Sequence, residues 1–334
     1  MKDVCNKHDI INEKKLCFMY AGQGTQYYGM ARALYNKNVV FRNTMDKMDK
    51  VIINTFGYSV IAELYSNNKT LSDRFKSIIY THPAIYMIEY SLTQTLIESG
   101  LIPSILIGSS LGEMVALAVA GYVTPETMLE FICLHALLIY DVCHLGGMIA
   151  VLGNRKIFDE MTSLGIITEM AAIIHDGHFI ISGECINIDM AEQYLLSKKI
   201  THSRLPIEYG FHSKNLDPIK SDFIELARNI KHGRRGIPVY SSTEIEEFQV
   251  ITEQILWMII RDTFDLRRAI NRISDLQNVV LIDVGPSGMF SNCAKVILNR
   301  KDSIYSIISP FNTEERCLDQ IINEYYPARK AQML

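Results

Sequence analysis

The stretch PSILIGSSLGEMVALAVAG, residues 103–121, decides the fold class. Its apolar run Ser104–Ile107 stands between a proline and a glycine, which favours a short buried strand. The residues Leu111–Ala120 then have helical composition and stop at Gly121, a residue that commonly ends helices. A buried strand that passes through a glycine turn into a helix is typical of α/β proteins.

The same alternation continues on both sides of this stretch. Strand-like apolar runs occur at Leu16–Tyr20, Ile237–Ser241 and Val279–Val284. Apolar residues recur at helical spacing within Thr81–Ser99, and Thr124 is a suitable N-cap for a further helix. Strands that alternate with helices predict an α/β fold with a parallel sheet.

The pattern changes after Gly146-Gly147, where short strand-like runs surround one or two helices. The strand-like runs are Met148–Leu152, Ala171–Ile174, Phe179–Ser182 and Ser203–Pro206, with a helical segment at Ile188–Lys198. We therefore expect an N-terminal tail over residues 1–15, an α/β body over 16–145 and 209–325, and a β-rich subdomain inserted over 146–208.

Composition excludes several classes of protein. The 334 residues carry 33 Lys and Arg against 37 Asp and Glu, a net charge of −4, which argues against a nucleic-acid binder that relies on bulk positive charge. Hydrophobic residues make up 48% of the chain, which argues against disorder. No apolar run reaches about 18 residues, and Met1–Lys15 is polar, so we expect neither a membrane span nor a signal peptide.

The cysteines point to a reducing compartment. There are seven, an odd number, and none forms a Cys-x-x-Cys pair. Reduced thiols in a cytoplasmic protein are the simplest interpretation. Because no metal-ligand spacing such as His-Glu-x-x-His occurs, we expect no metal and no redox cofactor.

The segment Gly108–Gly112 has the spacing of a nucleophile elbow. In such an elbow a sharp turn between strand and helix exposes the central serine, here Ser110, and the backbone N–H of the next residue, Leu111, can stabilise an oxyanion. The alternative is an ordinary tight turn that packs a helix on a sheet. The position between a predicted strand and a predicted helix favours the nucleophile.

A serine nucleophile needs a base, and nine histidines are available. Local sequence alone does not choose among His82, His178 and His212. The turn Gly22-Gln23-Gly24 after the first predicted strand lacks the spacing of a phosphate-binding loop. It is either an ordinary turn or the source of a second backbone N–H beside Ser110.

Five segments together resemble one family, the malonyl-CoA:acyl-carrier-protein transacylases and polyketide synthase acyltransferases. They follow the order of that family's motifs over roughly residues 16–312. The segments are Ala21–Gln26, Thr81–Ala84, the elbow Gly108–Glu113, Tyr209–Ser213 and Asp283–Pro286.

The resemblance implies a fold and an active site. It implies an α/β-hydrolase-like large subdomain with a parallel sheet, a ferredoxin-like small subdomain at 146–208, and an active site in the cleft between them. Ser110 would be the acylated nucleophile and His212 its base, a serine–histidine dyad. The backbone N–H groups of Gln23 and Leu111 would form the oxyanion hole. The family orients its histidine through a backbone carbonyl, which we expect near Ile259.

One departure from the family bears on the substrate. Malonyl-specific members carry an arginine on the helix after the nucleophile, and this chain has His135 there. A neutral histidine is a weak partner for a carboxylate, which loses solvation when it enters a cleft. The resemblance therefore implies uncharged acyl groups, with Ser109, His135 and Phe211 contacting the substrate. The alternative is that another cation replaces the arginine.

A second departure bears on the reaction. Ser109 stands where most family members have histidine, and with the missing arginine this resembles the discrete acyl hydrolases of trans-acyltransferase polyketide pathways. The first expectation is an acyl hydrolase that removes acyl groups from carrier proteins. The alternatives are an acyltransferase that moves a non-malonyl acyl group from coenzyme A to a carrier, and an inactive carrier-binding scaffold.

The resemblance also implies a partner, an acidic acyl carrier protein of a polyketide synthase whose phosphopantetheine carries the acyl group. Acyl-CoA is a further possible acyl source. By charge complementarity, a docking patch would use basic residues such as Lys214, Arg261, Arg267 and Arg268. For any single one of these, an ordinary solvated surface residue is the simpler interpretation.

Overall fold

A computed structural model describes residues 14–325 except 232, 234–235, 245 and 277. Its larger part is built on a five-stranded sheet in the order β10-β9-β1-β2-β7, in which all neighbouring strands are parallel. The strands are β1 (Lys15–Tyr20), β2 (Ile105–Gly108), β7 (Val239–Ser241), β9 (Val279–Asp283) and β10 (Ile304–Ser306). The strands β2 and β9 are fully buried, and so is β1 after its first two residues, as expected of a parallel sheet covered by helices.

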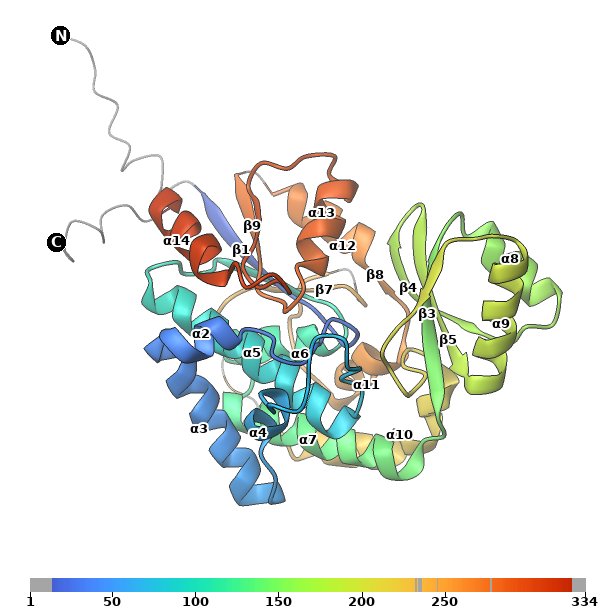
Figure 1. Ribbon diagram of the computed structural model, residues 1–334, viewed down its shortest axis with the longest axis horizontal. Helices are drawn as coiled ribbons and strands as arrows, with labels where there is room; N and C mark the ends of the chain where they lie inside the picture. Colours follow the sequence, from blue (N-terminus) through green and yellow to red (C-terminus); the bar gives the residue numbers. More distant parts are fainter. Residues whose placement is uncertain (1–13, 232, 234–235, 245, 277, 326–334) are drawn as a thin grey trace, which may run out of the picture.

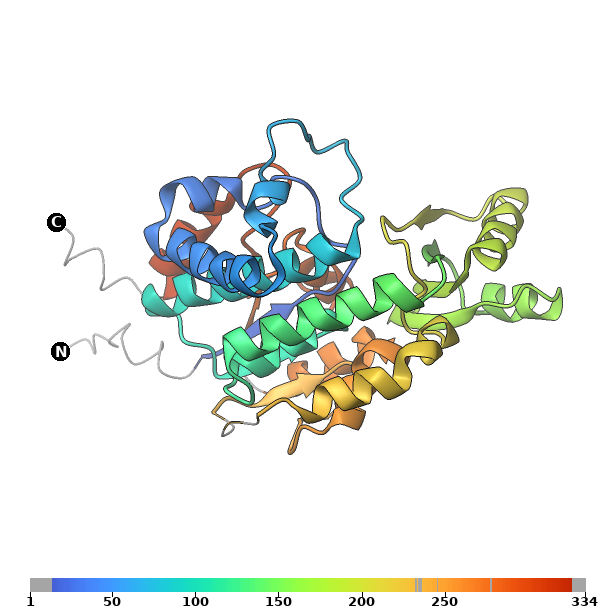
Figure 2. The same ribbon diagram turned by 90° about the horizontal axis from the view of Figure 1, so that it is seen from below.

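Helices cover both faces of this sheet (Figure 1). Those before the second sheet are α2 (Arg32–Lys37), α3 (Val39–Phe56), α4 (Val60–Leu64), α5 (Ile78–Glu98), α6 (Leu111–Val119) and α7 (Pro125–Val142). Those after it are a 3-10 helix η1 (Lys214–Ile219), α10 (Lys220–Arg228), α11 (Glu253–Arg261), α12 (Leu266–Ser274), α13 (Met289–Ile297) and α14 (Glu314–Tyr325). Figure 2 shows α7 running toward the smaller part, into which its C-terminal end leads.

The smaller part has a β-α-β-β-α-β order, the ferredoxin-like arrangement. Its elements are β3 (Gly146–Leu152), α8 (Lys156–Ser163), β4 (Glu169–His175), β5 (His178–Glu184), α9 (Cys185–Ser197) and β6 (His202–Arg204). The sheet order is β6-β3-β5-β4-β8, and its last strand, β8 (Phe264–Asp265), comes from the C-terminal part of the chain. The expected α/β class with a parallel sheet and a second, inserted unit is confirmed.

Side-chain alternation gives the second sheet two different faces. Ile149 and Val151 of β3 pack against α8 and α9 in one small core. The intervening residues Met148 and Ala150 face the other way, toward the larger part. The sheet therefore turns one apolar face to its own helices and another to the cleft.

Some boundaries differ from those expected. Gly146 and Gly147 belong to β3 and do not interrupt it, because they pair with Glu184 and Gly183 of β5. The strands β8 and β10 are two and three residues long, too short for the alternation on which strand predictions rest.

Candidate active site

Ser110 lies at the turn between the end of β2 and the start of α6. Its backbone has φ 53° and ψ −126°, a strained conformation for a residue with a side chain. The carboxyl ends of β1, β2 and β7 meet beside it, because Gly108 pairs with Tyr20 on one side and Ser241 on the other. The loops that follow these strands therefore converge on Ser110, as is usual for ligand sites in open parallel sheets.

Three glycines make room for this turn. A side chain at Gly108 would collide with the backbone of α6, and one at Gly112 with the end of β1. A Cβ at Gly22 would lie 2.9 Å from the carbonyl oxygen of Ser109 and 3.6 Å from the backbone nitrogen of Leu111. The loop after β1 therefore lies directly against the elbow.

His212 lies within hydrogen-bond distance of Ser110, with 2.9 Å between its Nε2 and the Ser110 Oγ. Its Nδ1 lies 2.7 Å from the carbonyl oxygen of Asp262, and its backbone N–H donates to the carbonyl of Ile260 over 3.0 Å. Because a carbonyl oxygen only accepts, Nδ1 carries the proton and Nε2 faces the serine hydroxyl with its lone pair. The orienting carbonyl expected near Ile259 belongs to Asp262, the C-cap of α11.

Burial keeps the His212 imidazole neutral. The residue is 2% exposed, and burial lowers its pKa to about 4. The hydrogen bond to the Asp262 carbonyl acts in the opposite direction, while the positive charge of Arg261 lowers the pKa further. At pH 7 the ring is therefore uncharged and can accept a proton.

Two backbone amides adjoin the serine. Leu111 is the first residue of α6, whose positive dipole end favours negative charge at this place. Across the described parts of the chain, neither its amide nor that of Gln23 has a hydrogen-bond partner. Both amides are thus free to donate to a bound group.

Gln26 fixes the loop that carries Gln23. Its Oε1 accepts from the Gly24 amide over 2.7 Å, and its Nε2 donates to the carbonyls of Phe75 and Pro206, each over 3.1 Å. Because Pro206 lies just after the last strand of the small unit, this side chain also joins the two parts of the molecule.

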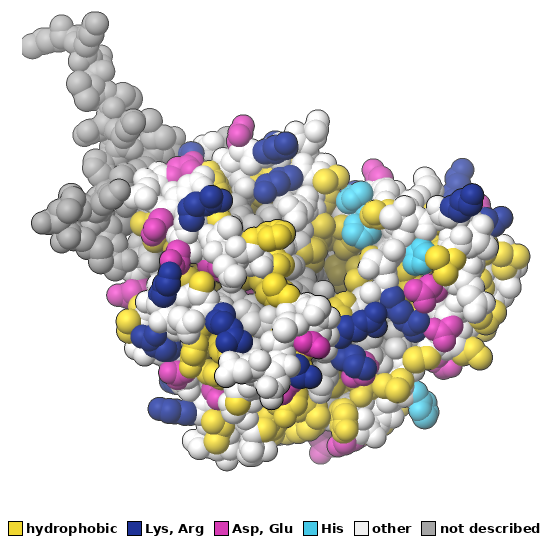
Figure 3. Space-filling model, in the orientation of Figure 1, with side chains coloured by type: hydrophobic (Ala, Val, Ile, Leu, Met, Phe, Trp, Pro, Cys, Tyr) yellow, Lys and Arg dark blue, Asp and Glu magenta, His cyan; other side chains and the backbone are white. Residues whose placement is uncertain are grey.

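An apolar cavity of about 130 Å³ lies beside Ser110 and His212, between the two parts of the molecule. Figure 3 shows the molecule hollowed there, with hydrophobic and histidine side chains around the opening. Its apolar lining residues are Met148, Ala150, Ile174, Ile180, Leu205, Phe211, Phe264 and Met289. No described arginine, lysine, aspartate or glutamate lines it.

The remaining expected substrate contacts divide into two groups. Ser109 and Phe211 line the cavity, as does His178, one of the alternative bases. His135 does not line it and is fully buried. Its ring packs against His82 with 5.1 Å between ring centroids, and His82 in turn packs against Phe211. Two rings thus separate His135 from the cavity, so the structure does not support its direct contact with substrate.

The four basic residues expected in a docking patch also divide. Arg261 and Arg267 are engaged in ion pairs with acidic neighbours. Lys214 and Arg268 are exposed, and no ion pair within the described ranges involves them.

Sequence reasoning missed several residues that hold the site. The carbonyl of Asp262 has no signal in the sequence, because any residue supplies a carbonyl. Glu113 did give one, a lone acid in the otherwise apolar helix α6. Its fully buried carboxylate accepts hydrogen bonds from Ser241, Ser242 and Thr243, at the end of β7.

Two other kinds of feature are absent from the described residues. No helix in them is long and apolar enough to cross a bilayer. No group of three or more His, Cys, Asp or Glu side chains among them is arranged to hold a metal ion.

Known proteins share both the sequence and the fold. The chain is 37% identical to the polyketide biosynthesis acyltransferase homolog PksD of Bacillus subtilis, over 94% of this chain and 98% of PksD. It is 35% identical to the homolog BaeD of Bacillus velezensis, over 92% of this chain and 95% of BaeD. The crystal structure of MCAT from Streptococcus pneumoniae has the same fold, with a TM-score of 0.77, 22% identity, and coverage of 93% of this chain and 100% of that one. Residues 17–305 match the acyl transferase domain family, and the chain belongs to that family.

Proposed function

We propose that this protein hydrolyses acyl thioesters on acyl carrier proteins, through an acyl group carried on Ser110, and that its substrates are uncharged acyl groups. The observation that carries the proposal is the cavity beside Ser110 and His212, whose described lining has no cation. The names of the relatives PksD and BaeD support a role in polyketide biosynthesis. The carrier protein of such a pathway, with its phosphopantetheine thioester, is the proposed partner.

The chemistry follows from the dyad. The Ser110 oxygen attacks the thioester carbonyl while His212 Nε2 takes the hydroxyl proton. The amides of Gln23 and Leu111 donate to the carbonyl oxygen and stabilise the negative charge that develops on it. The carbon–sulfur bond then breaks, and the thiol leaves with the proton from His212. Water attacks the acyl-serine with His212 again as base, and the acid leaves Ser110.

The preference for uncharged acyl groups rests on desolvation. A malonyl carboxylate in this cavity would lose much of its hydration without gaining an ion pair, which costs several kcal/mol. His135 offers no compensation, since it lies outside the cavity and burial lowers its pKa to about 4. Acetyl and longer saturated acyl groups have no such cost and gain contact with the apolar walls.

The choice of water over a second thiol rests on the elbow. Its Gly108-Ser109-Ser110 sequence, with no arginine on the next helix, resembles the discrete acyl hydrolases. Family membership favours the second candidate, an acyltransferase that delivers a non-malonyl acyl group to a carrier. The close contact between Ser110 and His212 argues against an inactive scaffold, which needs no such pair.

One experiment separates these candidates. Purified protein is incubated with carrier protein loaded with acetyl, hexanoyl or malonyl groups, with a second, unloaded carrier as acceptor, and acyl loss is followed by intact-protein mass spectrometry. Hydrolysis predicts free carrier and free acid from acetyl and hexanoyl, with malonyl retained. Ser110→Ala is expected to abolish acyl loss, and Ser104→Ala, a control at an exposed serine that does not line the cavity, to retain it.

Other results would select another function. Appearance of the acyl group on the second carrier would establish the acyltransferase. Rapid loss of malonyl would contradict the argument from the uncharged cavity. Carrier binding without loss of any acyl group would select the inactive carrier-binding scaffold.

A further inference from the structure

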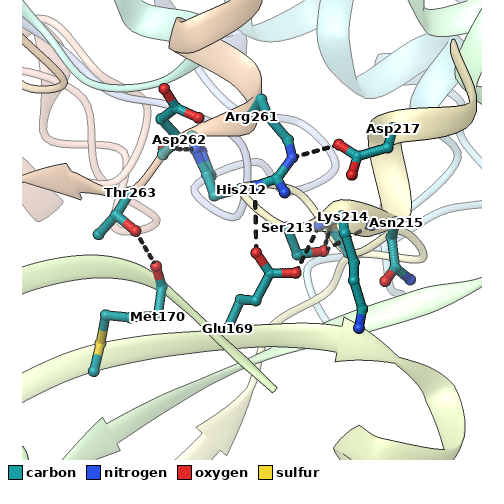
Figure 4. A network of polar contacts seen from close by, with 11 residues as sticks. Glu169, Met170, His212, Ser213, Lys214, Asn215, Asp217, Arg261, Asp262 and Thr263 are labelled. Carbon is teal, nitrogen blue, oxygen red and sulfur yellow. Dashed lines mark hydrogen bonds and ion pairs between the residues drawn. The ribbon is translucent and has the colours of Figure 1, made fainter. Parts of the chain in front are cut away.

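Glu169, the first residue of β4 in the small unit, reaches across to the residues around His212. Its Oε1 accepts from the backbone N–H of Lys214 over 2.7 Å, and its Oε2 pairs with Arg261 Nη1 over 3.3 Å. The same guanidinium is held on its other side by Asp217, with 2.6 Å between Arg261 Nε and Asp217 Oδ1. Figure 4 shows these contacts as one network around His212.

Glu169 contacts both the segment that carries His212 and the segment whose carbonyls position it. Lys214 follows His212 closely in the chain, so its amide belongs to the same turn. Arg261 stands between Ile260, whose carbonyl accepts from the His212 amide, and Asp262, whose carbonyl accepts from Nδ1. One carboxylate from the small unit therefore joins the segment that carries His212 to the segment whose carbonyls hold it.

The next residues of β4 continue this junction. The carbonyl of Met170 accepts from the hydroxyl of Thr263, and Ala172 pairs with Phe264 where β8 joins the second sheet. The segment that supports His212 thus becomes an edge strand of the small unit. The position of the segment that supports His212 therefore depends on how the small unit packs against the larger part.

These contacts fix the geometry around His212 more than they stabilise the fold. The side chains of Arg261 and Glu169 are 22% and 33% exposed, and ion pairs of such exposure contribute little to folding. His212 itself has φ 57°, a left-handed conformation that persists only where its surroundings impose it. A small displacement of a catalytic base lowers rates steeply, by about 100-fold for about 1 Å.

We propose that Glu169 is a positioning residue, which holds the Lys214 amide and the Arg261 guanidinium so that the Asp262 carbonyl keeps the His212 ring directed at Ser110. The proposal rests on the proposed role of His212 as the base for Ser110. It makes the small unit part of the dyad's support as well as a wall of the cavity.

The test measures the reactivity of Ser110 without a carrier protein or an acceptor. Full-length protein is treated with a fluorophosphonate, which phosphonylates an activated serine with loss of fluoride, and labelling is followed by intact-protein mass spectrometry at several reagent concentrations. Glu169→Ala is expected to lower the maximal labelling rate about 10- to 100-fold with unchanged half-saturation. Glu169→Gln, which keeps an acceptor for the Lys214 amide, is expected to lower the maximal labelling rate by a smaller factor.

The control is Glu192→Ala. Glu192 forms an ion pair of similar exposure with Arg204 in the same small unit, and neither residue touches the His212 network. It is expected to label at the wild-type rate within about twofold, because surface ion pairs of this kind contribute little.

Each outcome decides the proposal. Equal labelling of Glu169→Ala and Glu192→Ala overturns it, as does a change confined to half-saturation. Where Glu169→Ala has lost its fold by circular dichroism, Glu169→Gln decides by the same comparison. If the wild-type protein is not labelled while its fold is intact, the proposed dyad fails and this inference with it. If it is labelled but the variants match it, only this inference fails.

Discussion

Three buried histidines differ in what surrounds their ring nitrogens. Burial lowers the pKa of His82, His135 and His212 alike. In the described structure both ring nitrogens of His212 have oriented partners, whereas Nδ1 of His82 has none and His135 has a polar contact only with the backbone of Phe131 on its own helix. What sets His212 apart is therefore its pair of oriented contacts, and not the direction of its pKa shift.

The pH dependence of thioester cleavage should follow His212. Its Nε2 must be unprotonated to act as base, and burial lowers the pKa of this ring to about 4. We expect kcat/KM for a small acetyl thioester to be constant between about pH 5 and pH 8 and to fall as the pH drops through about 4. A steady-state pH profile measures this, and an acid limb centred near about pH 6.5, the ordinary value, would contradict it.

His135→Leu should stabilise the protein. At neutral pH the substitution removes a buried ring nitrogen without a partner and gives up a contact with the backbone of Phe131, a net gain of about 1 kcal/mol. Between pH 6.5 and 4 the unfolded state binds a proton at His135 that the folded state excludes, so acid destabilises the wild type more than the variant. The gain should therefore be about 2 kcal/mol larger at pH 5 than at pH 7.5. Urea unfolding at both pH values measures it, and destabilisation at pH 7.5 would contradict it.

At the scale of elements, the start of α6 is tied to the last residue of β7 and the two that follow it. Oxygen Oε1 of Glu113 accepts from Ser242 and Thr243, and Oε2 accepts from Ser241 over 2.7 Å. Burial raises the pKa of Glu113 to about 7, against the effect of these donors. Because Ser110 directly precedes α6, this network also fixes the elbow.

Replacing the Glu113 carboxylate by an apolar group should lower the free energy of unfolding more than removing its charge alone. Glu113→Leu leaves the donors of Ser241, Ser242 and Thr243 buried without an acceptor, and we expect it to lower the free energy of unfolding by at least about 3 kcal/mol. Glu113→Gln keeps one oxygen for most of these donors and should cost about 1 kcal/mol. Urea denaturation of both variants tests this, and similar losses for the two would contradict the argument that the acceptor oxygens decide the cost.

Elements with a clear apolar pattern could be predicted, and those made by long-range contacts could not. The strands β1, β2 and β9 follow from runs such as Leu16–Tyr20, because a parallel sheet buried on both faces needs them. By contrast, β8 forms only because Phe264 meets Ala172 of the distant β4. The carbonyl of Asp262 is a further example, since its role depends on where α11 ends and not on the residue type.

For the molecule as a whole, the motifs of the sequence led to Ser110 and His212. They also led to an expected contact between His135 and substrate that the structure does not support. Ser110 and His212 are 102 residues apart, and their contact could be expected only from the family resemblance. The position of His135 outside the cavity required the packing of His82 and Phe211 between them. A sequence gives residue types along helices, but which ring lies in front of another is settled by packing across the core.

The net charge of −4 sets a condition for docking of the proposed partner, an acidic carrier protein, because the molecule as a whole would repel it. Local cations must supply the attraction. Of the four expected, Arg261 and Arg267 already have acidic partners, which leaves the exposed Lys214 and Arg268 near the residues that frame the cavity. Any carrier contact near His212 should therefore depend on these two side chains.

The double variant Lys214→Ala/Arg268→Ala should raise KM for an acyl-carrier substrate about 3- to 10-fold, since rim charges contribute modestly and mainly to encounter. The effect should shrink in about 0.5 M salt, which screens exposed charges. A small acetyl thioester has no carrier to dock, so its kcat/KM should not change. Lys50→Ala, an exposed cation on α3, is the matched control and should leave both substrates unaffected. Equal losses with the carrier and the small thioester would instead place the defect in the dyad, because Lys214 shares the turn of His212.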